Sequence, residues 1–280
     1  MLLNIFELET KEYYERLRLL AGKHSRHHCL GFWGQPDQAA MDIFSQNGYT
    51  FIDLDIPRPD NICPAFVPQT TCQIIQVILA NACALRERLD FILAATGPDK
   101  CEQGRQTAEI LERLDFPVIN ASNTNKTPLR ASLISNAAGP LGPRVSRIME
   151  LAYRPLAKEE EIYYQSRQIK EAEVIFHGVP PADLSLLELF PDNTRIEGWT
   201  KLVELGVPGR VDLEWRIAPQ LPVVFFTQSF CHKGLLAAYL AKSTGGLHIE
   251  GHGAITGSTE AKLQAYLGLA GKTFQRGPQP

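Results

Sequence analysis

Residues 90–122 read DFILAATGPDKCEQGRQTAEILERLDFPVINAS. Two apolar runs, each of the length of a buried strand, flank a segment with the apolar spacing of a helix. A strand, a helix and a second strand in this order are typical of parallel strands joined by a crossover helix. We therefore take this stretch as the unit from which the fold is built.

The same alternation extends toward the N-terminus. Further strands are expected near 29–34 and 49–56, and helices at 35–48 and 70–89. The first of these helices has Pro36 early and Gly48 where a C-terminal cap belongs, and the second is expected to begin at a Thr cap. The proline-rich segment 57–68 is predicted to be a loop. These elements indicate a parallel sheet covered by helices on both faces.

The pattern restarts in the second half of the chain. Residues 126–170 are mainly helical in pattern, and strands are expected again at 173–179, 222–228 and 247–252. The sequence therefore predicts an α/β protein with two Rossmann-like lobes, whose parallel sheets are flanked by helices and joined by a helical connector. The expected ranges are an N-terminal helix at 1–28, a first lobe at 29–130, the connector at 131–170 and a second lobe at 171–280.

Composition limits the classes of function. With 44% hydrophobic and 21% charged residues the 280-residue chain should fold, and a net charge of −3 provides no basic surface for nucleic acid. No apolar run reaches the roughly 18 residues of a membrane span. Acidic residues interrupt the N-terminal segment, unlike in a signal peptide, so we expect a cytoplasmic protein with no membrane partner. Its six cysteines are then core residues, catalytic thiols or metal ligands.

The placement of the cysteines separates them into groups. Cys72 and Cys83 lie in an apolar helical pattern and are expected to be buried core thiols. Cys63, Cys101 and Cys231 instead follow predicted strands, at the sheet edge where α/β proteins bind ligands. Cys101 is expected in the first turn of its helix, where backbone N–H groups favour a thiolate. The separations are too large for a zinc ribbon or a CxxC site, so spacing alone is not specific.

Histidines supply weaker candidates. His248, Glu250 and His252 would share one face of a strand as a possible metal site, although satisfied polar residues at a strand end are the more common case. Cys231 and His232 resemble a cysteine–histidine catalytic pair, but adjacent loop residues rarely reach the required hydrogen-bond geometry.

Four windows together resemble a known family. The stretches ICPAF, DFILAATGPDKCEQGRQTAEIL, VVFFTQSFCHKG and GAITGSTEAKLQAYLGL follow the order seen in the 2-hydroxyacyl-CoA dehydratase and benzoyl-CoA reductase family, which includes the double-cubane-cluster proteins. The resemblance implies that Cys63, Cys101 and Cys231 bind a [4Fe–4S] or double-cubane cluster. It implies low-potential one-electron transfer to a small or acyl-thioester substrate, by an anaerobic dehydratase or reductase or a subunit of one.

The resemblance also implies partners: a second copy of the chain or a related subunit, and an ATP-dependent activator protein. Phe225, Phe226 and Phe230 are then expected to limit water access around Cys231. Dehydration would also require a general base, for which the sequence assigns no residue: His232, His248 and Glu250 could lie near the same edge, but nothing in the sequence fixes that.

The chain departs from the family pattern at several points. Gly34 stands where the family often has a cysteine, Glu102 replaces the usual Asp after Cys101, and the region 175–222 is short. The Glu102 change is mild, but Gly34 and the shortened region favour an alternative, a cluster-free binding or accessory protein of the same fold. A zinc protein that uses the same three cysteines, with His232 as a further ligand, is the other alternative.

Overall fold

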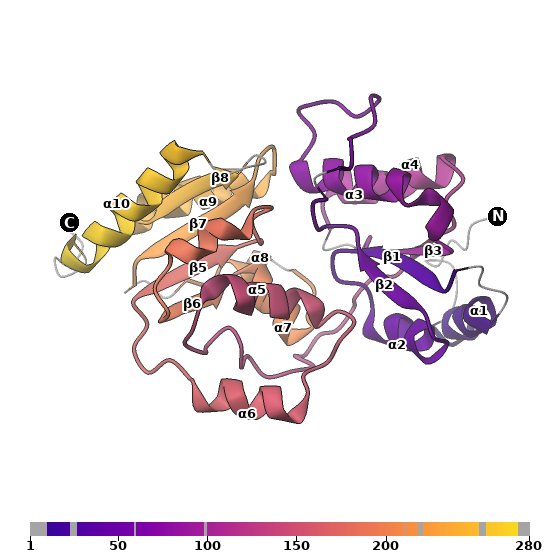
Figure 1. The fold of residues 1–280 in the computed structure, drawn as a ribbon, viewed down its shortest axis with the longest axis horizontal. Helices are drawn as coiled ribbons and strands as arrows, with labels where there is room; N and C mark the ends of the chain where they lie inside the picture. Colours follow the sequence, from indigo (N-terminus) through magenta and orange to yellow (C-terminus); the bar gives the residue numbers. More distant parts are fainter. Residues whose placement is uncertain are drawn as a thin grey trace. The chain divides into compact units, whose positions relative to one another are not determined.

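The computed structural model of the protein describes residues 10–22, 27–58, 60–97, 100–209, 211–217, 221–251 and 256–273. The chain divides into two compact units. The first is Met1–Thr127 with Gly206–Pro208, and the second is Pro128–Leu205 with Gly209–Pro280. In Figure 1 the chain runs from indigo, in the first unit, to yellow at the end of the second.

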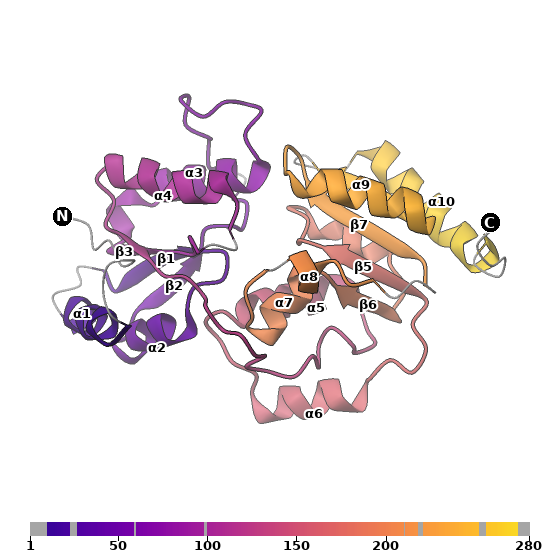
Figure 2. The ribbon, with the colours of Figure 1, turned by 180° about the vertical axis from the view of Figure 1, so that it is seen from behind.

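The first unit is built on a four-stranded parallel sheet in the order β2-β1-β3-β4. Helices α1 and α2 lie on one face of this sheet, and α3 and α4 lie on the other (Figures 1 and 2). The central strand β1 is buried along its whole length, which explains its unbroken apolar run. The elements are α1 (Thr10–Gly22), β1 (Cys29–Trp33), α2 (Gln38–Gln46), β2 (Thr50–Asp53), α3 (Gln73–Ala84), the 3-10 helix η2 (Arg86–Arg88), β3 (Phe91–Ala94), α4 (Glu102–Arg113) and β4 (Val118–Asn120).

Two helix starts differ from the sequence prediction. The N-cap of α2 is Asp37, whose carboxylate accepts the Ala40 N–H at 3.1 Å, so Pro36 precedes this helix instead of lying inside it. The expected Thr cap of α3 is wrong. Thr71 closes a turn back to the Pro68 carbonyl, and Cys72 becomes the N-cap, whose side chain makes no capping hydrogen bond.

The second unit repeats the same topology. Its parallel sheet has the order β6-β5-β7-β8, so in both units the first strand in sequence lies between the second and the third. The elements are α5 (Leu141–Glu150), α6 (Lys158–Ser166), β5 (Val174–Gly178), the 3-10 helix η3 (Leu184–Leu189), β6 (Thr194–Glu197), α7 (Trp199–Leu205), α8 (Val211–Glu214), β7 (Val223–Gln228), α9 (Lys233–Thr244), β8 (Leu247–Gly251) and α10 (Gly257–Thr273).

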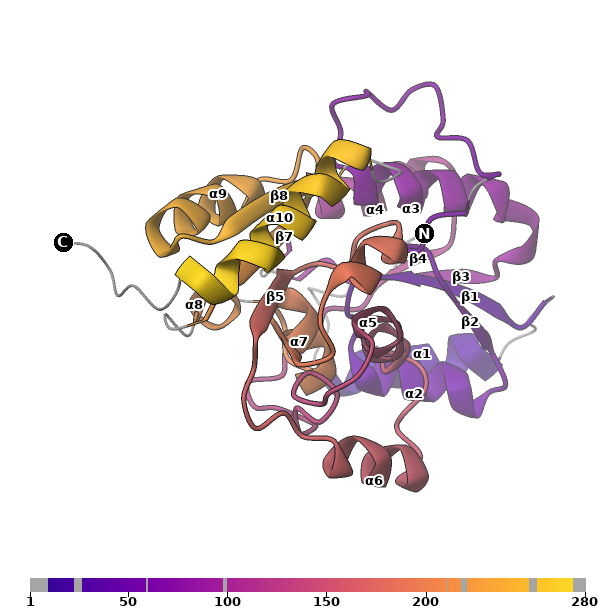
Figure 3. The ribbon, with the colours of Figure 1, turned by 60° about the vertical axis from the view of Figure 1, so that its left-hand side comes forward.

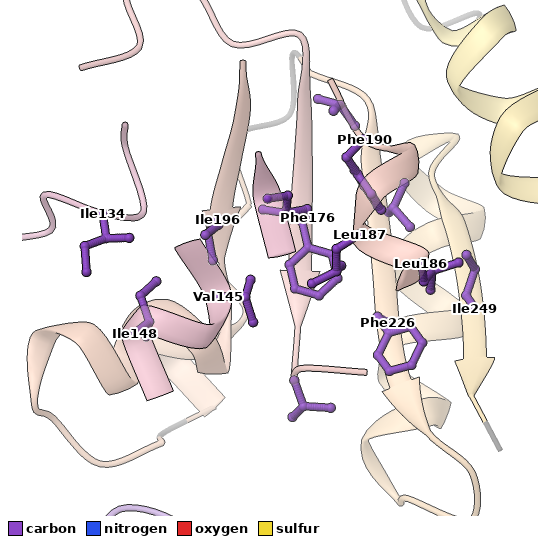
Figure 4. Packing of buried hydrophobic residues seen from close by; sticks show 14 of the residues in the cluster. Ile134, Val145, Ile148, Phe176, Leu186, Leu187, Phe190, Ile196, Phe226 and Ile249 are labelled. Carbon is purple, nitrogen blue, oxygen red and sulfur yellow. The ribbon is translucent and has the colours of Figure 1, made fainter. Parts of the chain in front are cut away.

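Alternate residues of β5 and β7 fill two separate cores. Phe176 and Phe226 pack on one face, in a cluster that includes residues of α5, η3 and α10 (Figure 4). Ile175 and Phe225 pack on the opposite face, against α9. The helical segment that contains α5 is part of the second unit's core, because Val145 and other apolar residues of α5 are buried there.

The two-lobed α/β prediction is thus confirmed, with two four-stranded parallel sheets flanked by helices. Among the residues that the structure describes, no helix has both the length and the apolar character required to span a membrane.

Candidate functional site

The shared topology identifies one edge in each sheet as the candidate site. In open parallel sheets, ligands bind outside the carboxyl ends of the strands, at the point where the strand order reverses. There, the connection after the first strand leads to one side of the sheet and the connection to the third strand leads to the other. This switch point lies between β1 and β3 in the first unit and between β5 and β7 in the second. Cys101 follows β3 and Cys231 follows β7, so both stand at the start of the helix after a third strand.

Cys101 is the N-cap of α4, one residue before the predicted first turn. Its backbone is extended, with φ −68° and ψ 155°, and its sulfur accepts the Gly104 N–H at 3.3 Å. A Cβ at position 104 would lie 3.6 Å from this sulfur, an ordinary contact, so the hydrogen bond does not require a glycine there. The side chain is partly buried. The Gly104 N–H thus caps this sulfur, and the thiolate expected at this position stays a prediction.

Cys63 lies in the long loop between β2 and α3, which projects beyond α3 (Figure 3). Its thiol is partly buried, while its neighbour Ile62 is 87% exposed. Burial raises the pKa of the Cys63 thiol, and the nearby Cys83 thiol raises it further. The free side chain therefore favours the neutral thiol, and a metal ion would have to displace its proton.

Cys231 lies in the turn that leads from β7 into α9. Its N–H donates to the Gln228 carbonyl at 3.1 Å, and its own carbonyl accepts the Gly234 N–H at 2.9 Å. Phe230 adopts a left-handed conformation with φ +59°, and its ring is 47% exposed. The expected aromatic shield around Cys231 stays a prediction, and Phe230 is not buried as that prediction assumed. Phe225, by contrast, is fully buried in the sheet's core.

The histidine candidates have structural partners. His248 Nε2 lies 2.9 Å from Thr227 Oγ1, and burial lowers the pKa of this imidazole. Glu250 accepts the Phe230 N–H at 3.1 Å, so its carboxylate holds the turn before Cys231. His232 is the exposed N-cap of α9, and His252 lies outside the described residues. Satisfied polar residues at a strand end thus fit His248 and Glu250 better than a metal site.

The three cysteines are distributed over both units. Cys63 and Cys101 belong to the first unit, and Cys231 belongs to the second. Within the described part of the chain, no three His, Cys, Asp or Glu side chains form a group that could hold a metal ion.

A carboxylate pair at the edge of the first sheet was missed in the sequence. Asp55 Oδ2 accepts the N–H of Gly34 at 2.7 Å, and Asp53 Oδ1 accepts the N–H of Asp55 at 2.8 Å. Gly34 has φ +66°, a conformation that favours glycine. Burial raises the pKa of Asp55 to about 6, and burial together with the charge of Asp55 raises the pKa of Asp53. A proton is therefore exchanged here near neutral pH. The only sequence signal was an Asp-Leu-Asp run at the end of a predicted strand.

We expect Asp55→Asn to make the first unit more stable than the wild type at pH 8. The pKa of this carboxyl group is about 6 in the folded protein, above its ordinary value of 3.8. The neutral group therefore stabilises the fold below pH 3.8, and this contribution is lost as the pH rises through 6. The amide never ionises, and its oxygen can still accept the Gly34 N–H. The expected gain at pH 8 is about 1–3 kcal/mol and shrinks as the pH falls below 6.

Urea denaturation between pH 4.5 and 8 in steps of about one unit measures this difference, with hydrogen exchange of β1 and β2 as the local readout. The exposed Asp60→Asn is the matched control and should leave the profile unchanged. An Asp55→Asn protein that is less stable than the wild type at pH 8 would contradict the assignment.

A second missed cluster lies beside the switch point of the second unit. The Glu214 carboxylate, only 4% exposed, accepts two hydrogen bonds from Lys233 Nζ at 2.6 and 2.8 Å. The Glu214 carbonyl accepts from His177 Nε2 at 2.7 Å, and the Trp215 ring stacks on the imidazole at 4.9 Å. Burial lowers the pKa of His177, and because a carbonyl oxygen can only accept, Nε2 is the donor in this hydrogen bond. These contacts fasten α8 to the start of α9, two residues beyond Cys231.

Comparison with known proteins adds no family assignment to this geometry: no protein-family model and no curated protein matches the chain.

Proposed function

We propose that the protein binds an iron–sulfur cluster through Cys63, Cys101 and Cys231 and transfers single electrons at low potential to a small or acyl-thioester substrate. The observation that carries the proposal is the equivalent placement of Cys101 and Cys231 in two units of identical strand order. Each cysteine stands at the start of the helix after the third strand, at the edge where α/β sheets bind ligands. The sequence resemblance to the dehydratase and reductase family supports the same three residues.

The donor chemistry of these residues fits the cluster. Thiolates are the ligands that iron–sulfur clusters require, and the three cysteines are partly exposed and not joined in a disulfide. A bound cluster supplies one-electron transfer to the substrate. The raised pKa of Cys63 makes loading depend on pH, because each ligand must lose its proton.

The remaining parts of the proposal concern protons and partners. Asp55, with a pKa of about 6 at the edge of the first sheet, is suited to exchange a proton with a bound ligand near neutral pH. As in the resembling family, the protein acts with a second copy of itself or a related subunit, and it receives electrons from an ATP-dependent activator.

The test is to purify the protein without oxygen and to measure iron, acid-labile sulfide and zinc per chain. We expect about four or more irons with matching sulfide, since a [4Fe–4S] cluster is the smallest unit proposed. A variant with Cys63, Cys101 and Cys231 changed to Ala should lose both. The matched control changes Cys29, a cysteine outside the proposed set, to Ala and should keep them.

Two results would overturn the proposal. Iron that the triple variant retains would assign the metal to other residues, and zinc without sulfide would indicate the zinc protein instead. A protein without metal would support the cluster-free binding protein. That second candidate is favoured by one observation: among the described residues, no three potential ligand side chains form a metal-binding group.

A further inference from the structure

The outer edge of strand β8 carries backbone groups that have no partner in the second unit. β8 is an outer strand of its sheet, and the Gly251 carbonyl accepts the Ser229 N–H at 2.7 Å, so the backbone groups of Gly251 face β7. Because the backbone groups of successive residues point to opposite sides of a strand, those of His248 and Glu250 face outward. Among the residues that the structure describes, no hydrogen bond reaches these outward groups. They are therefore available to another strand.

The other outer strand of this sheet, β6, is covered by the chain itself. Ile196 donates its N–H to the Ser135 carbonyl at 3.0 Å, and the Thr194 carbonyl accepts from Arg144 Nη2 at 2.8 Å. The segment before α5, together with α5, thus binds the outward backbone groups of β6. An edge strand without such cover is a template for pairing with another chain. In the second unit, pairing is therefore expected at β8.

The sequence of β8 is complementary to itself. Two copies of the strand can pair antiparallel about a two-fold axis at Ile249, which places His248 of each copy opposite Glu250 of the other. These are the residues whose backbone groups face outward, so each opposite pair can exchange both of its backbone hydrogen bonds. Directly opposite side chains lie on the same face of a sheet. His248 Nε2 lies 2.9 Å from Thr227 Oγ1, which leaves Nδ1 to face the carboxylate of the second copy.

The outer strand β2 of the first unit lacks this complementarity. Thr50 donates its N–H to the His28 carbonyl, before β1, at 2.7 Å, so Phe51 and Asp53 are the residues whose backbone groups face outward. The same two-fold arrangement of β2 would place a phenyl ring opposite a carboxyl group. Asp53 is also only 6% exposed. A second copy is therefore expected to bind at β8 and not at β2.

Helix α9 adds an apolar surface beside the edge of β8. It packs against both β7 and β8, and a Cβ built at Gly234 would lie 4.0 Å from the His248 ring, so Gly234 marks the flank of α9 on the side of β8. Ala238 is exposed one turn further along this flank, and Leu235 beside it is 84% exposed. Strands lie about 4.8 Å apart, so the α9 helices of two paired copies would be about 10 Å apart, an ordinary distance for packed helices.

We propose that the protein forms a two-fold symmetric dimer in which the β8 strands of two copies pair antiparallel about Ile249. The two sheets of the second units then become one continuous sheet, and the two α9 helices pack side by side on one of its faces. The proposed function includes a second copy as a partner, and this inference names the surface that it binds. The pairing itself depends on β8 and α9 alone and does not require a cluster.

The test measures the mass of the full-length protein by sedimentation equilibrium over a series of concentrations. We expect a dimer. His248→Glu places two carboxylates opposite each other at both pairs, which should raise the dimer dissociation constant by about tenfold or more. The double variant His248→Glu with Glu250→Lys again pairs opposite charges and should restore the dimer. Glu109→Lys, a change of charge on the exposed surface of α4, is the matched control and should leave the dissociation constant unchanged.

Hydrogen exchange of the wild type locates the pairing residue by residue. The His248 and Glu250 amides should become more protected as the protein concentration rises through the dissociation constant. The Ile249 amide, which faces β7 in the monomer as well, should change little. Three results would overturn the proposal: a wild type that stays monomeric, a dimer in which the two outward amides exchange as in the monomer, or a double variant that dimerises no better than His248→Glu.

Iron content separates this inference from the proposed function. A chain that loads iron and sulfide but stays monomeric would refute the dimer and leave the cluster standing. A dimer with the expected protection of β8 and no metal would do the reverse.

Discussion

Replacing Gly178 by Ala is expected to destabilise the second unit severely. Gly178 is the last residue of β5 and has φ +148°, a region that side chains rarely allow. A Cβ built at this position would lie 2.1 Å from the carbonyl oxygen of Phe226 in the neighbouring strand β7. Because the clash is with backbone, no rotamer change can relieve it, and β5 would have to separate from β7.

The expected loss exceeds about 4 kcal/mol, which places this substitution among the exceptional ones for a single residue. Urea denaturation of the whole chain gives the magnitude, and hydrogen exchange of β5 and β7 locates it. Gly268→Ala is the matched control, since a Cβ there meets nothing within 4 Å. In the middle of α10 it should stabilise the helix by about 0.5–1 kcal/mol. A Gly178→Ala protein with protected β5 amides would contradict the prediction.

The second large effect is expected for Glu204→Ala. Glu204 lies in α7, is 1% exposed, and accepts the N–H groups of Ile134 at 2.5 Å and Ser135 at 2.9 Å, as well as the Ser135 hydroxyl. These donors belong to the segment that precedes α5. Alanine would leave two buried N–H groups without an acceptor, each at a cost of about 1–3 kcal/mol, in addition to the lost packing.

We expect a loss of about 3–5 kcal/mol, measured by urea denaturation, with increased hydrogen exchange at Ile134 and Ser135. Glu204→Gln keeps one acceptor oxygen and should lose less than the alanine variant. Glu109→Ala, which removes one partner of the exposed ion pair with Arg113, is the control and should change stability by less than about 0.5 kcal/mol. A Glu204→Ala protein as stable as that control would show that another acceptor replaces the carboxylate.

Much of the fold was predictable because its strands are buried on both faces. Such strands appear in the sequence as short continuous apolar runs, as at Phe91–Ala94 and in the first four residues of Val223–Gln228. The start of α4 was predictable to within one residue, since the Gly-Pro-Asp run shortly before Cys101 in the sequence is a turn signal. The start of α3 was not, because the turn that closes at Thr71 depends on a backbone hydrogen bond to Pro68.

The polar residues at the sheet edges could be predicted much less well. Asp53 and Asp55 resemble an ordinary solvated strand end, and their raised pKa values arise from burial. Glu214 and Lys233 are 19 positions apart, and neither lies in a motif that suggests the other. Asn81, in an apolar helix, gave no sign that it holds the loop of Cys63.

The sequence by itself determined the alternation of strands and helices and the position of each cysteine relative to a strand, because both depend on local periodicity and turn chemistry. Only the tertiary structure decided that the first and third strands are neighbours in each sheet, which makes Cys101 and Cys231 equivalent. It alone also decided which thiols and carboxyl groups are desolvated. Desolvation depends on atoms supplied by distant parts of the chain, and no local pattern records it.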